Sequence, residues 1–185
     1  MIGCRNPESS MEVSEGQYQK EIKEQEENDA RPCVFEQTDK VITKTYPFDQ
    51  SDKVELISYQ PRCDGFENME LIVNGRFSVK DIQERIELKE EQIDSLFSLL
   101  YNYKTGKSSN IYAVTDCYTP RHSIVFYKQE KAIAFIEICF ECGQIKYSNG
   151  IEAGELCDEK WCKWWKFLQS NNIHFGMLDN YYNCQ

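Results

Sequence analysis

The feature that most constrains the fold of this chain is a pair of nearly continuous apolar segments, residues 123–127 and 132–140. They flank the polar residues 128–131, a connection of the length that β-hairpins use. Strands that lack polar alternation are covered on both faces of their sheet. The sequence therefore predicts a central β-hairpin that turns at Gln129 and Glu130.

Alternating apolar and polar positions predict further antiparallel strands around this hairpin. Asn74–Gly75 is a typical type I′ turn signal and joins two of these strands. The predicted strands are residues 41–48, 54–60, 69–73, 76–79, 111–114 and 143–148.

Apolar positions that recur every three and four residues predict two helices. Residues 88–103 carry acids in the first turn, where the helix dipole favours them. Residues 155–170 carry three tryptophans on one face, which indicates packing against a core rather than an aromatic ligand cage. We therefore predict a single α+β domain over residues 32–185, with an antiparallel sheet of about six or seven strands covered by two helices.

The charge balance excludes one large class of partner. The chain has 21 Lys and Arg residues against 31 Asp and Glu residues, a net charge of −10. Nucleic-acid binding needs a basic surface, so we expect a protein partner instead, and a basic one that an acidic surface attracts. No run of apolar residues reaches the roughly 18 that a membrane-spanning helix needs.

The composition of residues 1–31 predicts a disordered, acidic tether rather than part of the core. They carry eight acids and four bases, with few aliphatic residues at any regular spacing. Ile2-Gly3-Cys4 resembles the end of a bacterial lipoprotein signal, in which the cysteine is acylated. The expectation is a lipid anchor at Cys4 that holds the domain at the cell envelope, in the periplasm or on the outer membrane. Without acylation Cys4 is an exposed thiol, and the expected location is the cytoplasm.

Cysteines dominate the candidate site chemistry, and the chain has nine of them. In the predicted hairpin register Cys117 faces Cys142, and directly opposed residues bring their Cβ atoms to about 5 Å. This favours a Cys117–Cys142 disulfide, which leaves Cys139 and Cys157 to join the sheet to the second helix. Such pairing requires an oxidising compartment.

A metal site is the alternative interpretation of the same residues. Cys139 and Cys142 have the spacing of a metal knuckle, and His122 follows Cys117 by five residues. Together Cys117, His122, Cys139 and Cys142 would bind zinc or iron, with Cys157 as a substitute fourth sulfur ligand. In a reducing compartment this interpretation replaces the disulfides.

A third interpretation takes Cys139 and Cys142 as the active cysteines of a thiol–disulfide oxidoreductase, because Cys-x-x-Cys is its motif. Such motifs normally open a helix whose N-terminus lowers the pKa of the thiol, whereas residues 143–148 alternate like a strand. The sequence contains no glycine-rich nucleotide loop, no GxSxG elbow and no HExxH zinc helix. We therefore expect a protein that is not an enzyme and carries no cofactor.

Arg121 and His122 follow Pro120 at the entrance to the first strand of the hairpin. Such a pair binds a carboxylate ligand, acts in acid–base chemistry, or pairs with carboxylates of its own chain. The last interpretation is favoured, because the predicted register puts Glu137 opposite His122.

The motif Cys-x-x-Pro-Arg-His at residues 117–122, followed by Cys-Phe-x-Cys at residues 139–142, resembles a group of uncharacterised bacterial proteins. Many of these proteins are predicted to be lipoproteins or secreted. The similarity covers residues 88–176, about half of the chain. The resemblance implies an envelope or secreted location and a shared motif, and it implies no activity.

These observations lead to one functional hypothesis, a non-enzymatic binding protein of the cell envelope that disulfides hold together. Its acidic surface suits a basic protein partner, because opposite charges speed the encounter. An immunity or inhibitor protein that neutralises such a partner is the concrete form of this hypothesis. A metal-binding protein and a thiol–disulfide oxidoreductase are the two alternatives.

Overall fold

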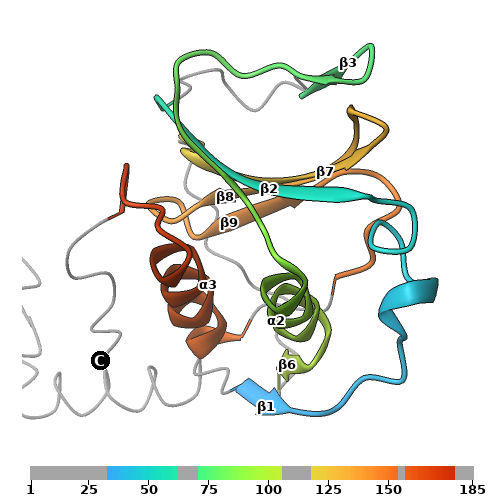
Figure 1. Cartoon of the computed structure of the whole chain (residues 1–185). Coiled ribbons are helices and arrows are strands. Elements are labelled where there is room, and N and C mark those ends of the chain that lie inside the picture. Colours follow the sequence, from blue (N-terminus) through green and yellow to red (C-terminus); the bar gives the residue numbers. More distant parts are fainter. Residues whose placement is uncertain (1–32, 62–70, 106–117, 154–156, 178–185) are drawn as a thin grey trace, which may run out of the picture. The chain divides into compact units, whose positions relative to one another are not determined.

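The computed structural model describes residues 33–61, 71–105, 118–153 and 157–177 (Figure 1). The chain divides into two units, Met1–Ala30 and Arg31–Gln185, and all described elements belong to the second. Four predictions lie outside the described residues: the tether over residues 1–31, the anchor at Cys4, the strand over residues 111–114, and the position of Cys117.

A five-stranded antiparallel sheet forms the middle layer of the described residues, in the strand order β5-β2-β7-β8-β9. The predicted hairpin is β7 and β8, and neither strand is at an edge of the sheet. Both strands are buried along most of their length, as their continuous apolar sequences predict. The strands are β2 (Lys53–Tyr59), β5 (Ile82–Glu87), β7 (His122–Lys128), β8 (Lys131–Cys139) and β9 (Gln144–Tyr147).

Helices α2 (Glu90–Tyr101) and α3 (Asp158–Ser170) cover one face of this sheet (Figure 1). Their contacts with the sheet form the main core, in which Trp164 is fully buried. Trp165 is buried in the same core and Trp161 packs against it, so the interpretation of the tryptophans as core residues is confirmed. An antiparallel sheet covered by two helices confirms the predicted α+β architecture.

A short hairpin of β3 (Ile72–Val73) and β4 (Arg76–Phe77) covers the opposite face of the sheet. Asn74 and Gly75 have positive φ angles of 51° and 73°, which confirms the predicted type I′ turn. Phe77 packs against a second buried cluster. This cluster consists of Ile57, Tyr59, Val125, Tyr127 and Ala132.

A two-stranded ribbon of β1 (Cys33–Phe35) and β6 (Tyr103–Thr105) lies beside the helices (Figure 1). Lys160 of α3 is fully buried, and its ammonium donates hydrogen bonds to the backbone oxygens of Leu100, at 3.0 Å, and Tyr103, at 3.1 Å. Burial lowers the pKa of Lys160 to about 8. This lysine therefore supplies donors at the C-terminus of α2, where the helix has none of its own.

The predicted register of the central hairpin is correct at its turn and wrong further out. Lys128 pairs with Lys131 as predicted, but the register shifts by one residue two pairs later, at a β-bulge. Beyond the bulge Glu137 pairs with Ser123, so the predicted pairing of Glu137 with His122 is wrong. A bulge adds one residue to one strand, and two continuous apolar segments contain no alternation that would reveal it.

Residues 41–48 do not form the predicted strand. Ile42–Lys44 is a single turn of 3-10 helix, η1, and the chain then folds into turns in which the Pro47 carbonyl accepts two amide hydrogen bonds. Proline lacks the N–H that a strand interior requires. The apolar residues of this segment serve the core instead, because the ring of Phe48 packs 5.1 Å from the ring of Phe126.

Candidate functional site

All five cysteines among the described residues are in disulfides. Cys33 in β1 is bonded to Cys157, the residue that precedes α3. Cys139, the last residue of β8, is bonded to Cys142. Cys162 in α3 is also disulfide-bonded. The expectation of a disulfide-rich domain is therefore supported, although the partners differ from the predicted ones.

The two predicted disulfides, Cys139–Cys157 and Cys117–Cys142, are wrong. The chain turns directly after β8, so that the Cα atoms of Cys139 and Cys142 are 5.3 Å apart. Gly143 completes this turn at a positive φ of 61°, a conformation that glycine adopts without strain. Cys142 therefore bonds within its own turn, and Cys157 is left for β1, a three-residue strand too short to predict from its sequence.

Three of the four residues predicted as metal ligands, His122, Cys139 and Cys142, are described by the structure, and each already has a bonding partner. The sulfurs of Cys139 and Cys142 are bonded to each other, so neither is a free thiolate. The Nε2 atom of His122 lies at 2.8 Å from the carbonyl oxygen of Phe175, a hydrogen-bond distance. Cys117 lies outside the described residues. Within the described residues, Cys139 and Cys142 therefore provide no thiolate for zinc or iron.

Another group of possible metal-binding atoms comes together at the Cys33–Cys157 disulfide. Cys33, Cys157 and Glu159 each place one donor atom within 4.8 Å of the others. The two sulfurs are bonded to each other, and a Glu159 oxygen accepts a hydrogen bond from the backbone N–H of Cys33 at 2.6 Å. Cys157, the predicted substitute ligand, is therefore also in a disulfide and is not a free thiolate.

A buried carboxylate lies next to the cysteine turn. Glu137 precedes Cys139 by two residues on β8, so both side chains point to the sheet face away from the helices. Its oxygens accept hydrogen bonds from the hydroxyls of Tyr59, at 2.7 Å, and Tyr118, at 3.0 Å. The Tyr59 and Ser123 hydroxyl oxygens are 3.0 Å apart. Glu137 is 1% exposed, so these hydroxyls replace the water that would otherwise donate hydrogen bonds to its oxygens.

The segment that leads into β7 is bound to the same turn. The backbone N–H of Thr119 donates a hydrogen bond to Sγ of Cys142 at 3.3 Å, and the N–H of Cys142 donates to Sγ of Cys139 at 3.2 Å. The guanidinium of Arg121 forms an ion pair with Glu141. The interpretation of Arg121 as the partner of a local carboxylate is therefore confirmed, with Glu141 as that carboxylate.

His122 is a buried neutral side chain rather than an exposed acid–base group. It is 2% exposed, and its ring packs 5.5 Å from the ring of Phe140. The pKa of His122 is lowered to about 4, chiefly by burial and in smaller part by the positive charge of Arg121, while the hydrogen bond to Phe175 acts in the opposite direction. The geometry therefore gives His122 a structural role between β7 and the segment after α3.

Acidification is expected to destabilise the fold through His122. Its pKa is about 4 in the folded chain and about 6.5 when unfolded, so between these values only the unfolded chain takes up the proton. The free energy of unfolding should therefore fall from pH 6.5 towards pH 4, by up to about 3 kcal/mol. Urea unfolding at several pH values measures this loss. The variant His122→Gln, which cannot titrate, should show a shallower slope, and identical slopes would contradict the assignment.

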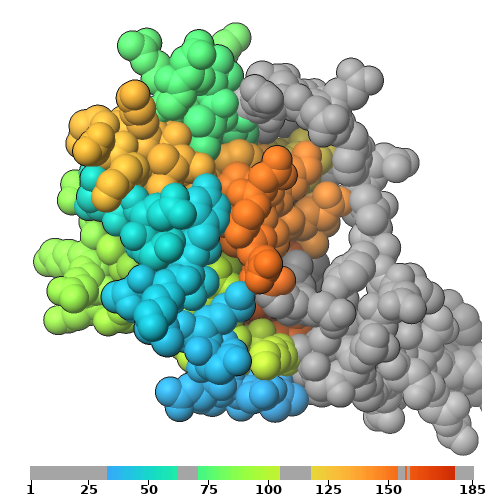
Figure 2. All heavy atoms as spheres, turned by 90° about the vertical axis from the view of Figure 1, so that its right-hand side faces the viewer, coloured from blue at the N-terminus to red at the C-terminus, as the bar shows by residue number. Residues whose placement is uncertain are grey.

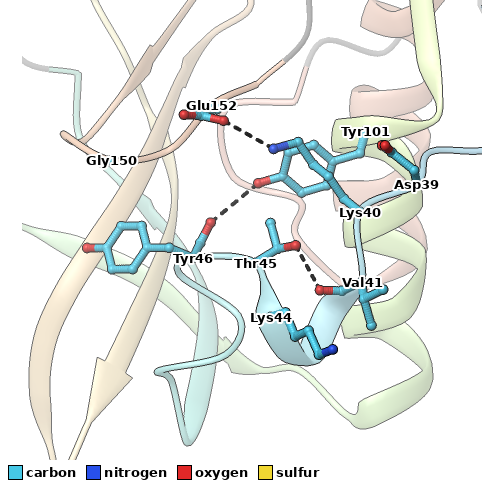
Figure 3. Close-up of a pocket in the computed structure, with 9 residues that line it drawn as sticks. All are labelled: Asp39, Lys40, Val41, Lys44, Thr45, Tyr46, Tyr101, Gly150 and Glu152. Atoms are coloured by element: carbon cyan, nitrogen blue, oxygen red, sulfur yellow. Dashed lines mark hydrogen bonds and ion pairs between the residues drawn. The ribbon is translucent and has the colours of Figure 1, made fainter.

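A pocket of about 570 Å³ lies on another face of the molecule (Figure 3). Figure 2 shows this face, where the blue residues after β1 meet the orange residues after β9. Lys40 forms an ion pair with Glu152 at 3.2 Å across the pocket, and its ammonium lies 5.3 Å from the centre of the Tyr101 ring. Burial and the Glu152 carboxylate raise the pKa of Tyr101 to about 12. The volume is in the range that holds a small molecule.

Gly150 lines the pocket and lies close to the ring of Tyr46. Its φ is +91°, and a Cβ atom at this position would lie 3.0 Å from the Tyr46 ring. Tyr46 is fixed in turn, because its hydroxyl donates a hydrogen bond to the backbone oxygen of Ile133 at 2.9 Å. No sequence pattern indicated this pocket, since its residues come from three separate segments of the chain.

Comparison of the chain with protein-family models, curated proteins and solved structures finds no match. Within the described ranges, no helix has both the length and the apolar character that crossing a membrane requires. A functional assignment therefore rests on the chemistry of the described residues.

Proposed function

We propose that this protein is a non-enzymatic binding protein of the bacterial cell envelope that takes a basic protein partner, as an immunity or inhibitor protein does. The observation that carries the proposal is the oxidised state of all five described cysteines. Disulfides persist in secreted and envelope compartments and are rare in a reducing cytoplasm. A lipid anchor at Cys4, if acylated, would hold the domain in such a compartment.

The charge of one surface supports a basic partner. Residues 81–94 contain six acids and two bases, so they contribute −4 to the −10 of the whole chain. One of the two bases, Arg85, is already bound to Glu55. The acids at the end of β5 and in the first turns of α2 are exposed and form no ion pair within the described part of the chain. They are Glu87, Glu90, Glu91 and Asp94.

The two alternative functions receive less support from the geometry. A metal site would need free thiolates, whereas Cys139 and Cys142 are bonded to each other. A thiol–disulfide oxidoreductase normally places its motif at a helix N-terminus, whereas this turn joins two strands. Both cysteines are also buried, at 1% and 5% exposure, which hinders attack by an external thiolate.

The charge of this surface is the part of the proposal that is tested most directly. The triple variant Glu90→Gln, Glu91→Gln, Asp94→Asn is expected to weaken partner binding at least about tenfold, because it removes three charges that attract a basic protein. The partner is captured with the disulfide-intact chain from envelope and secreted fractions and identified by mass spectrometry. Its dissociation constant is then measured at low and at high salt.

The matched control removes three acids that already have partners. Glu36→Gln, Glu130→Gln and Glu152→Gln neutralise carboxylates that are paired with Lys104, Lys53 and Lys40 respectively. This second triple variant is expected to change the dissociation constant less than about twofold. Capture of no basic protein, or equal losses in the two triple variants, would contradict the proposed function.

A further inference from the structure

Strand β5 is an outer strand of the five-stranded sheet and pairs, within the described residues, with β2 alone. The N–H of Leu88, just after β5, donates a hydrogen bond to the Val54 carbonyl at 2.8 Å. Because backbone groups alternate in direction along a strand, Ile86 also faces β2, whereas Arg85 and Glu87 direct their N–H and C=O groups outward. Both outward residues are exposed. Among the residues that the structure describes, nothing pairs with these outward backbone groups, so the edge offers them to an incoming chain.

The other outer strand does not offer the same edge. All four residues of β9 are partly buried. The ammonium of Lys146 lies 3.7 Å from the centre of the Tyr118 ring, so it belongs to a contact with the segment before β7. The two edges also differ in charge, because β9 carries a lysine and no acid whereas β5 belongs to the stretch with a net charge of −4.

The charges around β5 determine which chain can add to it. The Glu55 carboxylate, next to β5 on β2, accepts ion pairs from Arg85 and Lys53, so the cation on the edge is already neutralised. Glu87 stands directly opposite Glu55 in the register, and no ion pair of Glu87 is present in the described part of the chain. A second copy of this chain would bring two acidic edges together, which is unfavourable. A segment rich in lysine or arginine meets no such repulsion.

We propose that the outward edge of β5 is the docking site for an extended, lysine- or arginine-rich segment of the partner, which adds to the sheet as a further strand. This inference rests on the proposed function and names the part of the surface that performs it. The backbone groups of Arg85 and Glu87 hold the segment, and the acids from Glu87 to Asp94 select its charge. Main-chain bonds give affinity in this mode, and the side chains give specificity.

A synthetic peptide of alternating valine and lysine, eight residues long and capped at both ends, is the probe. It is titrated into the full chain with its disulfides intact, and amide hydrogen exchange is followed residue by residue. The expected result is that exchange at the N–H groups of Arg85 and Glu87 slows at least about tenfold. A peptide with glutamate in place of lysine should leave these rates unchanged. Unchanged rates with the lysine peptide would overturn the proposal.

Two variants at one position separate the backbone contribution from the charge. Glu87→Pro removes the outward N–H and the carboxylate and leaves the Leu88–Val54 hydrogen bond in place, because Glu87 does not donate to β2. Glu87→Ala removes the carboxylate alone. Binding should fall about two- to threefold in Glu87→Ala and be lost in Glu87→Pro. Equal affinities of the two variants would overturn the proposal.

A change on the peptide side keeps the test decisive if Glu87→Pro fails to fold. Methylation of alternate backbone nitrogens of the lysine peptide blocks its hydrogen bonds without altering the protein. Two peptides are compared, each methylated on one of the two alternating sets of nitrogens. Methylation of the set that faces β5 should abolish binding, and binding that is unchanged by methylation of either set would overturn the proposal. If the captured basic partner binds Glu87→Pro as tightly as the unchanged chain, the edge is not its site and only this inference fails. If no basic partner is captured while the peptide docks, the proposed function fails and the edge remains.

Discussion

Replacement of Cys33 and Cys157 together by alanine is expected to lower the free energy of unfolding by about 4 to 5 kcal/mol. The disulfide joins residues 124 positions apart and therefore ties the start of the described chain to the start of α3. A link across a loop of this length restricts the unfolded chain strongly, and the chain-entropy model gives about 4.7 kcal/mol for a loop of about 100 residues. Urea or guanidinium unfolding of the two proteins measures the difference.

A control at the same contact separates the covalent bond from the hydrogen bond beside it. Glu159→Ala removes the carboxylate that accepts the N–H of Cys33 and keeps the disulfide. Its expected cost is below about 1 kcal/mol, because the hydrogen bond is exposed to solvent. If the double cysteine variant loses no more stability than Glu159→Ala, the disulfide does not stabilise the fold in this way.

Replacement of Glu137 by alanine is expected to cost about 3 to 4 kcal/mol of unfolding free energy. The carboxylate accepts hydrogen bonds from the buried hydroxyls of Tyr59 and Tyr118, and alanine provides neither acceptor nor volume. Glu137→Gln keeps the shape and one acceptor oxygen and should cost about half as much. Thermal and urea unfolding of both variants provide the measurement, and a cost below about 1 kcal/mol for alanine would contradict it.

A double-mutant cycle tests whether the tyrosine and the carboxylate act as a pair. Tyr118→Phe alone should cost about 1 kcal/mol, since it removes one hydroxyl that donates to Glu137. In the Glu137→Ala background the same replacement should cost less, because the acceptor is already absent. Equal costs in the two backgrounds would show that the hydrogen bond contributes nothing of its own.

The central hairpin could be predicted because two long apolar segments with a short polar loop between them leave few other arrangements. Its register could not, since a bulge between uniformly apolar strands changes no visible pattern. Residues 41–48 show the opposite failure, where alternation is present but Pro47 prevents strand pairing. The pattern of apolar residues therefore predicted the two central strands of the sheet. The register of these strands and the conformation of residues 41–48 depend on local backbone chemistry, which that pattern does not reveal.

At the candidate site, too, the sequence indicated individual residues but did not indicate their partners. Glu137 was visible as the acid that interrupts the apolar run, and the motif around Cys139 and Cys142 was visible from its spacing. The hydrogen-bond partners of Glu137 could not be predicted from the sequence, because Tyr59 is 78 residues away and lies on another strand. The disulfide partners could not be predicted either. Which sulfurs come within bonding distance depends on a one-residue shift in strand register and on one short strand, and neither is visible in the sequence.

Lys160 gives the layer of helices a property that neither helix has alone. Its ammonium belongs to α3, whereas its acceptors are the Leu100 carbonyl at the end of α2 and the Tyr103 carbonyl in β6. Unwinding of either helix would leave a buried amine or buried carbonyls without partners, at a free-energy cost that the remaining helix cannot recover. The two helices are therefore expected to open together, as one cooperative unit that shields the sheet beneath them from solvent.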